Sequence, residues 1–152
     1  MNIFYLHENP EISAKMHCDK HVVKMIIEYA QLMSTAHRIL DGDEYEGKTK
    51  IGRRIRRWKH PNKNIENTIY KASHINHPSN LWVRESQNHY NWLYEMWEHL
   101  CYEYTHRYGK IHGCADALFE AKKTFHQFAG EVITCYCMVE SFTRAMPNEF
   151  KH

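Results

Sequence analysis

The sequence predicts an all-α protein with a single domain spanning residues 1–152, and three observations favour it. Apolar residues recur at three- and four-residue steps over long stretches, as they do on the buried face of a helix. The chain contains only 6 glycines and 4 prolines, the residues that most often interrupt helices. No repeat or linker divides the 152 residues, a length typical of one domain. We therefore expect a compact domain of three or more long helices, with a short extended N-terminal segment and an irregular basic loop.

The first helical region is predicted from Asn9-Pro10 to Leu40. Asparagine is a favoured N-cap residue, and proline fits the first turn of a helix. A break is expected near Cys18-Asp19, and Asp41-Gly42-Asp43 ends the apolar pattern. Residues 2–6 are too few for periodicity to distinguish a strand from a capping segment.

The next segment, residues 44–64, is poor in apolar residues and rich in cations. Its Lys and Arg residues are Lys48, Lys50, Arg53, Arg54, Arg56, Arg57, Lys59 and Lys63. Ile51, Ile55 and Trp58 recur at four- and three-residue steps, which permits a short helix with its apolar side against the core. The cations would then surround the rest of this helix and contact phosphates. The alternative is a solvated surface loop whose charges serve solubility.

His77-Pro78 has a helix-start pattern, and residues 81–108 have the period of a long amphipathic helix that ends at Gly109. A further helix is predicted over residues 115–129, and its surroundings favour helix for residues 131–142 as well. The aromatic residues of the long helix are Trp82, Tyr90, Trp92, Tyr94, Trp97, Tyr102, Tyr104 and Tyr108. They fall on several sides of the helix, so some rings are expected to be exposed. Such rings hold bases, or serve a membrane or protein partner.

Several classes of protein are not expected. No apolar run approaches the roughly 20 residues that cross a bilayer, and the N-terminal residues lack the basic region of a signal peptide. Five cysteines, an odd number, argue against a disulfide framework. Their spacing does not complete a zinc site. We expect a cytoplasmic protein with reduced thiols, no membrane contact, no metal and no cofactor.

Two groups of residues are candidates for a site. His21, Lys24 and Glu28 share one face of the first helical region, which places a base, an amine and an acid in one row. An ordinary ion pair between Lys24 and Glu28 is the alternative. The helix start at His77 exposes N–H groups that favour a phosphate, with Arg84 close by. Simple helix capping is the alternative there.

Several motifs resemble those of a family of small phage and microbial proteins. They are His17–Met25, Ser34–His37, His77-Pro78, Leu81-Trp82, Glu103–Tyr108 and Ala145–Pro147. The family is labelled as pyrimidine-dimer DNA glycosylase, or endonuclease V-like. In the glycosylase, a His on the first long helix precedes the catalytic Glu by seven positions, and His21 and Glu28 have this spacing. The resemblance implies that Glu28 stabilises the sugar cation while an N-terminal amine, here that of Met1, attacks C1′.

Two features depart from the family pattern. Asn2 is bulky enough for Met1 to be retained, whereas the glycosylase exposes a small residue. Ile27 and Gln31 stand where the glycosylase has arginines beside its Glu. Both departures concern the lyase chemistry.

The sequence therefore predicts a DNA-binding protein of the dimer-glycosylase type, which extrudes a damaged or modified pyrimidine nucleotide and cleaves its glycosidic bond. The catalytic candidates are Glu28, His21 and Met1. The residues expected to contact DNA are Lys24, Arg53, Arg54, Arg56, Arg57, Lys59, His77, Trp82 and Arg84. Two alternatives stay open. One is a non-catalytic nucleic-acid-binding or phage–host interaction protein, and the other is a nucleotide-level enzyme or metalloprotein that uses the histidines.

Overall fold

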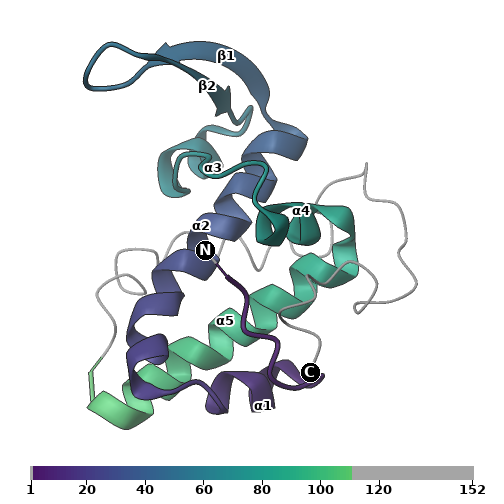
Figure 1. The fold of residues 1–152 in the computed structure, drawn as a ribbon, viewed down its shortest axis with the longest axis vertical. Coiled ribbons are helices and arrows are strands. Elements are labelled where there is room, and N and C mark those ends of the chain that lie inside the picture. Colours follow the sequence, from purple (N-terminus) through teal and green to yellow (C-terminus); the bar gives the residue numbers. More distant parts are fainter. Residues whose placement is uncertain (1, 111–152) are drawn as a thin grey trace.

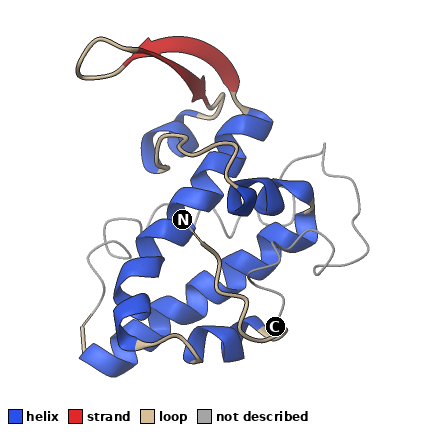
Figure 2. Cartoon of the chain, viewed as in Figure 1, coloured by secondary structure: helices blue, strands red, loops and turns tan. Residues whose placement is uncertain are grey.

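The computed structural model describes residues 2–110, and these form a mainly helical fold with one β-hairpin (Figures 1 and 2). The elements are α1 Pro10–Lys15, α2 Asp19–Asp41, β1 Asp43–Lys48, β2 Arg54–Lys59, α3 Lys63–Thr68, α4 Pro78–Glu85 and α5 Gln87–Tyr108. The hairpin corrects the all-α prediction. The helices expected over 115–129 and 131–142 lie outside the described residues. Within the described part, no helix is long and apolar enough to cross a membrane.

The predicted starts and ends of the first two helices are confirmed. Asn9 caps α1, its side-chain oxygen accepting the N–H groups of Glu11 (2.9 Å) and Ile12 (3.3 Å). The expected break separates α1 from α2, and α2 ends at Asp41. Glycine is required at the next position, because a Cβ on Gly42 would collide with the carbonyl oxygen of Arg38. The chain can therefore turn directly from α2 into β1.

The long helix predicted over residues 81–108 is two helices. Ser86 has an extended backbone (φ −152°, ψ 156°), and its side chain accepts the N–H of His89 at 3.1 Å. This N-cap begins α5 and ends α4. Gly109 ends α5 in the left-handed conformation (φ 66°), as the sequence predicts.

The core lies where α2, α4 and α5 pack together, with α1 against α5 (Figure 1). Tryptophan indoles join these elements through their N–H groups as well as their rings. Trp97 on α5 donates to the carbonyl of Ile26 on α2 at 3.0 Å, and Trp92 donates to that of Glu8 at 2.8 Å. Each large ring is thereby buried without leaving its polar atom unsatisfied.

The basic segment forms an antiparallel hairpin, which is neither the irregular basic loop that we expect from the sequence nor the short helix that its apolar spacing permits. Glu44 pairs with Trp58 and Lys48 with Arg54 across the two strands. The connection, residues 49–53, places Gly52 at φ 83°, a conformation that glycine adopts without strain. Successive residues of a strand point to opposite faces, so Ile55 and Trp58, which are three residues apart, lie on different faces of β2.

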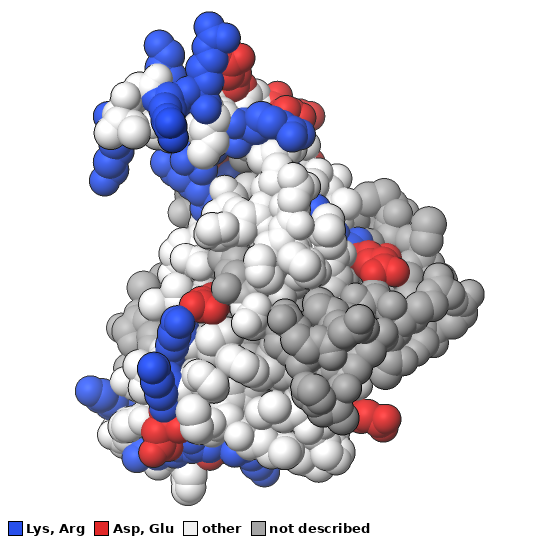
Figure 3. All heavy atoms as spheres, viewed as in Figure 1, with Lys and Arg blue, Asp and Glu red and all other residues white. Residues whose placement is uncertain are grey.

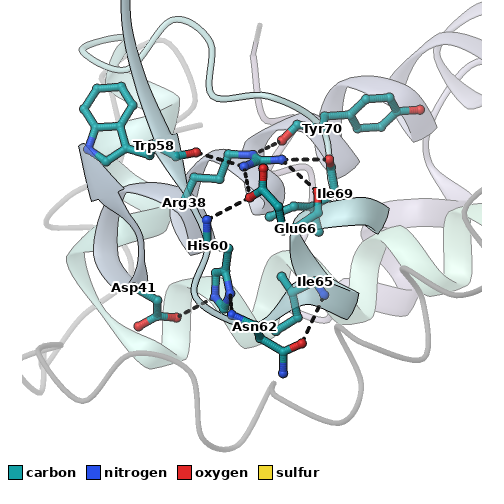
Figure 4. A network of polar contacts seen from close by, with 9 residues as sticks. All are labelled: Arg38, Asp41, Trp58, His60, Asn62, Ile65, Glu66, Ile69 and Tyr70. Atoms are coloured by element: carbon teal, nitrogen blue, oxygen red, sulfur yellow. Dashed lines mark hydrogen bonds and ion pairs between the residues drawn. The ribbon is translucent and has the colours of Figure 1, made fainter. Parts of the chain in front are cut away.

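Arg38 on α2 joins the hairpin to the helical body (Figure 4). Its guanidinium is buried and donates to the carbonyl oxygens of Trp58 (2.9 Å), Ile69 (3.2 Å), Tyr70 (2.6 Å) and Glu66 (3.3 Å), and to the Glu66 carboxylate. All five of its N–H groups therefore have acceptors. The acceptors belong to β2, to α3 and to the turn after α3, so one side chain fixes all three segments to α2.

Replacing Arg38 with lysine should lower the free energy of unfolding by about 3 kcal/mol, because lysine offers three donors instead of five and leaves buried acceptors without a partner. Urea unfolding measures this change. The matched control is Arg54→Lys in the exposed Arg54–Glu46 ion pair, which should cost under about 0.5 kcal/mol. Equal losses for the two variants would contradict the role of Arg38.

Candidate nucleic-acid interface and carboxylate row

The hairpin holds the excess positive charge of the chain. Residues 43–59 carry seven Lys and Arg side chains and three carboxylates, a net charge of +4, whereas the whole chain has a net charge of +2. The hairpin extends beyond the helices at one end of the molecule (Figure 1), and Figure 3 shows its Lys and Arg side chains gathered there. The fold thus presents a basic arm away from a body of opposite net charge.

Two arginines of β2 are held by glutamates of β1. Arg56 binds Glu44 through two hydrogen bonds of 2.7 and 3.3 Å, and Arg54 contacts Glu46 at 3.1 Å. The Arg56 hydrogen bond lowers the pKa of the Glu44 carboxyl. Arg56 also lies 5.1 Å above the centre of the Trp58 ring. These contacts set the direction of both guanidiniums along one face of the arm.

Other cations of the arm project without a partner. Across residues 2–110, no side-chain hydrogen bond or ion pair engages Lys48, Lys50, Arg53 or Lys59. Arg57 is tethered differently, donating to the carbonyl of Ala72 at 3.4 Å. The predicted DNA contacts Arg53, Arg54, Arg56, Arg57 and Lys59 all lie on the arm, and Arg53 and Lys59 have unshared charges.

The tip of the arm combines charge with an exposed apolar side chain. Ile51 is 82% exposed and lies between Lys50 and Arg53 in sequence. Tyr45 on β1 is also exposed. The apolar spacing of the sequence permitted a buried helix face that included Ile51, and it gave no role to Tyr45. Residues 54–59 carry no alternating pattern, since the apolar residues Ile55 and Trp58 are three residues apart.

Three predicted DNA contacts lie elsewhere, in and around α4. Trp82 is only 1% exposed and stacks on His89 at 4.2 Å, so the expectation that its ring holds a base is wrong. His77 caps α4 by accepting the N–H of Ser79 at 3.1 Å. Arg84 donates to the carbonyl of Ile75 at 2.8 Å. The contacts of His77 and Arg84 fit the capping alternative, because both serve the local backbone.

The exposed rings of α5 are Tyr102 and Tyr108. Both lie in the last two turns of α5, at the end of the molecule opposite the hairpin (Figure 1). The expectation that exposed rings occur on this segment is confirmed, but they are not next to the basic arm.

Glu28 and Lys24 lie together on α2, and their side chains form an ion pair of 3.6 Å. The Glu28 side chain is 20% exposed, so it is partly withdrawn from water, while that of Lys24 is open to solvent. His21 shares this face but stacks on Phe4, with ring centres 4.3 Å apart. The structure therefore places the Glu28 carboxylate beside the Lys24 amine, whereas the His21 ring stacks on Phe4.

The N-terminal segment lies against the same part of α2. The N–H of Phe4 donates to the Tyr29 hydroxyl at 3.2 Å, and Ser13 holds the Phe4 carbonyl at 3.0 Å. Because Tyr29 follows Glu28, the segment passes beside the turn of α2 that bears the carboxylate. Met1 lies outside the described residues.

A buried histidine holds this arrangement in place. His17 Nδ1 donates to the Ser13 carbonyl at 2.8 Å, and its Nε2 accepts from the Tyr29 hydroxyl at 2.8 Å. Burial lowers the pKa of His17 and raises the pKa of Tyr29, so both are neutral near pH 7. The N-terminal segment thus depends on a neutral imidazole.

One further group was missed by the sequence analysis. His37 and Asp41 lie one turn apart at the end of α2, and His60 follows β2. The Asp41 carboxylate is 3.8 Å from a ring nitrogen of each histidine. The four-residue spacing of His37 and Asp41 on one helix was the available signal, whereas only the hairpin brings His60 to them.

No family model matches this chain, and no curated protein or solved structure is significantly similar to it. Three arrangements in the described part of the chain have functional potential: the basic arm, the Glu28–Lys24 pair, and the His37–Asp41–His60 group.

Acidification should destabilise the fold through His17. Its pKa is lowered by folding, so below about pH 6.5 the unfolded chain binds a proton that the native state excludes, and stability falls as pH decreases. Urea midpoints measured at about pH 7.5, 6.5 and 5.5 test this. His17→Gln should be less stable at pH 7.5 and should show a shallower pH dependence. A pH dependence unchanged by the substitution would show that His17 is not responsible.

Proposed function

We propose that this protein binds duplex DNA through the β1–β2 arm. The observation that carries the proposal is the net charge of +4 on a projecting two-stranded ribbon, with several cations that have no partner across residues 2–110. The major groove of B-DNA is about 12 Å wide and admits such a ribbon. The deep, narrow major groove of A-form RNA does not, which favours DNA.

The arm has separate parts for positioning and for contact. Glu44 and Glu46 hold Arg56 and Arg54 in fixed directions, which lowers the conformational entropy lost on binding. The unshared charges near the tip neutralise phosphates and release counterions. Ile51 at the tip is an exposed apolar side chain of the kind that contacts the thymine methyl group in the major groove.

A second function, base release at Glu28, is favoured by the partly withdrawn carboxylate next to an amine and to the N-terminal segment. Asp41 lies thirteen residues after Glu28 on α2, so the two are about 20 Å apart along the helix axis at 1.5 Å per residue. That distance corresponds to about six base-pair steps of 3.4 Å, so a duplex held by the arm reaches Glu28 when it runs along α2.

The chemistry follows the resemblance to the glycosylase family. An amine attacks C1′ of the extruded nucleotide, the bond from C1′ to the base breaks, and the base leaves with a proton. The Glu28 carboxylate stabilises the positive charge that develops on the sugar and assists the proton transfer. Two amines are candidates: the terminal amine of Met1, as the family implies, and that of Lys24, 3.6 Å from Glu28.

The double substitution Lys50→Gln with Arg53→Gln should weaken binding to a fluorescent duplex about tenfold. It should also reduce the slope of log K against log salt by about 1.8, because each phosphate contact contributes about 0.9. Fluorescence anisotropy at several salt concentrations measures both quantities.

The matched control is Lys20→Gln with Lys110→Gln, which removes the same charge from exposed positions at the opposite end of the molecule. It should leave the slope nearly unchanged. If both double variants reduce affinity and slope equally, binding follows net charge and does not use the arm.

Glu28→Gln should abolish release of a modified pyrimidine from duplex DNA while leaving DNA affinity within about twofold, because the substitution removes the charge and keeps the shape. Release is followed by mass spectrometry of the free base. Borohydride trapping followed by peptide mapping identifies the amine, with an adduct on Met1 or on Lys24. Salt-dependent binding with no product from any lesion tested would overturn base release and leave a non-catalytic DNA-binding protein.

A further inference from the structure

We infer that His37, Asp41 and His60 form a binding site for a divalent transition-metal ion of the zinc class. One ligand atom of each residue lies within 4.8 Å of the ligand atoms of the other two. Each histidine nitrogen is 3.8 Å from the same carboxylate oxygen. The site is separate from the arm cations and from Glu28, and it does not depend on DNA binding.

The His37 ring is oriented as a ligand requires. It is almost fully buried, and its Nε2 contacts the Tyr90 hydroxyl at 2.7 Å. When Nε2 donates that hydrogen bond, the lone pair is on Nδ1, the nitrogen that lies 3.8 Å from Asp41 Oδ2. A hydrogen bond from the distal ring nitrogen is the usual support of a metal-bound histidine, because it selects the tautomer and fixes the ring.

His60 contributes an observation that itself indicates a ligand. The residue is 7% exposed, and its Nε2 is buried without a hydrogen-bond partner among the described residues. Figure 4 shows its ring directed toward Asp41. A buried polar atom without a partner destabilises the native state, so a native fold rarely retains one. A metal ion between His60 and Asp41 would supply the partner.

The donor set and its access to solvent suit zinc. Two imidazoles and a carboxylate are ligands that Zn²⁺ accepts, and catalytic zinc sites use three protein ligands with an open fourth position. The Asp41 side chain is 32% exposed, which gives the ion a path and leaves room for water. Zinc bonds of about 2.0–2.1 Å put tetrahedral ligands about 3.3 Å apart. The two 3.8 Å distances to Asp41 therefore contract by about 0.5 Å on binding, and the distance between the histidine nitrogens, which is within 4.8 Å, by up to about 1.5 Å.

Coordination also requires a tautomer change at His60. Its Nδ1 accepts the N–H of Asn62 at 3.1 Å, so in the metal-free protein the ring proton is on Nε2. On binding, this proton leaves through solvent and Nδ1 takes one up, so the ring stays neutral. The Asn62 contact is given up, at a cost of about one hydrogen bond.

The position of the ligands suggests what the ion does. His37 and Asp41 come just before β1, and His60 comes just after β2. An ion bound by all three closes the base of the arm. Because it binds the folded state and not the unfolded chain, it stabilises the junction between hairpin and helices.

The test uses the full chain, free of any histidine tag and dialysed against a chelator. Titration with ZnCl₂ in a calorimeter should show one ion per chain with micromolar or tighter affinity, and saturating zinc should raise the melting temperature. Asp41→Asn and His60→Gln should each weaken binding about tenfold or more. The matched control His106→Gln removes an exposed histidine of α5 and should bind as the parent does.

If His60→Gln folds poorly, Asp41→Asn still tests the site. Asp41 lies at the solvent edge of the site, and asparagine keeps the size and shape of the side chain. Substitution with Co²⁺ adds a spectrum, in which nitrogen and oxygen ligands give visible bands without the intense thiolate absorption of a cysteine site. No binding at about 100 μM zinc, or zinc binding equally strong in Asp41→Asn, would overturn the site. A tight site lost in Asp41→Asn and kept in His106→Gln supports it.

Discussion

The placement of the arm depends on the buried guanidinium of Arg38. A charged group withdrawn from water is costly unless each of its donors meets an acceptor, and Arg38 meets this condition only when β2, α3 and the following turn are all in place. Glu66 extends the network, because its carboxylate also accepts the backbone N–H of His60 at 2.7 Å. The base of the arm and the helical body therefore form together or not at all.

The buried contacts of Arg38 fix the base of the arm, whereas the tip of the arm has no such contacts among the described residues. The arm is anchored at its base by buried polar contacts, while its tip carries Ile51 and charges that no side chain of the described part neutralises. At the other site, His17 and Tyr29 hold the N-terminal segment against α2, at the residue that follows Glu28, through neutral hydrogen bonds. Arg38 positions the arm, and the His17–Tyr29 pair positions the N-terminal segment. The hydrogen bonds of these positioning residues are made within the protein, which is what binding without large rearrangement requires.

The helix boundaries were predictable because their signals are local. Asn9, Gly42 and Gly109 act on backbone groups within a few residues, so their effect is visible in the sequence. The hairpin was not predicted, because its pairs join residues 43–48 to residues 54–59 and no helical window contains both. The break at Ser86 was missed since the apolar period continues across it, although its capping oxygen bonds only three residues ahead.

The sequence alone determined a mainly helical chain, the concentration of cations between residues 48 and 59, and the shared face of Lys24 and Glu28, because each follows from composition or from spacing along one element. Only the tertiary structure decided that the cations extend on a ribbon, that Trp82 is buried, and that His60 meets His37 and Asp41. These outcomes depend on which distant segments pack together. That packing is set by buried area and by the satisfaction of polar groups, and neither quantity is a property of a local stretch of sequence.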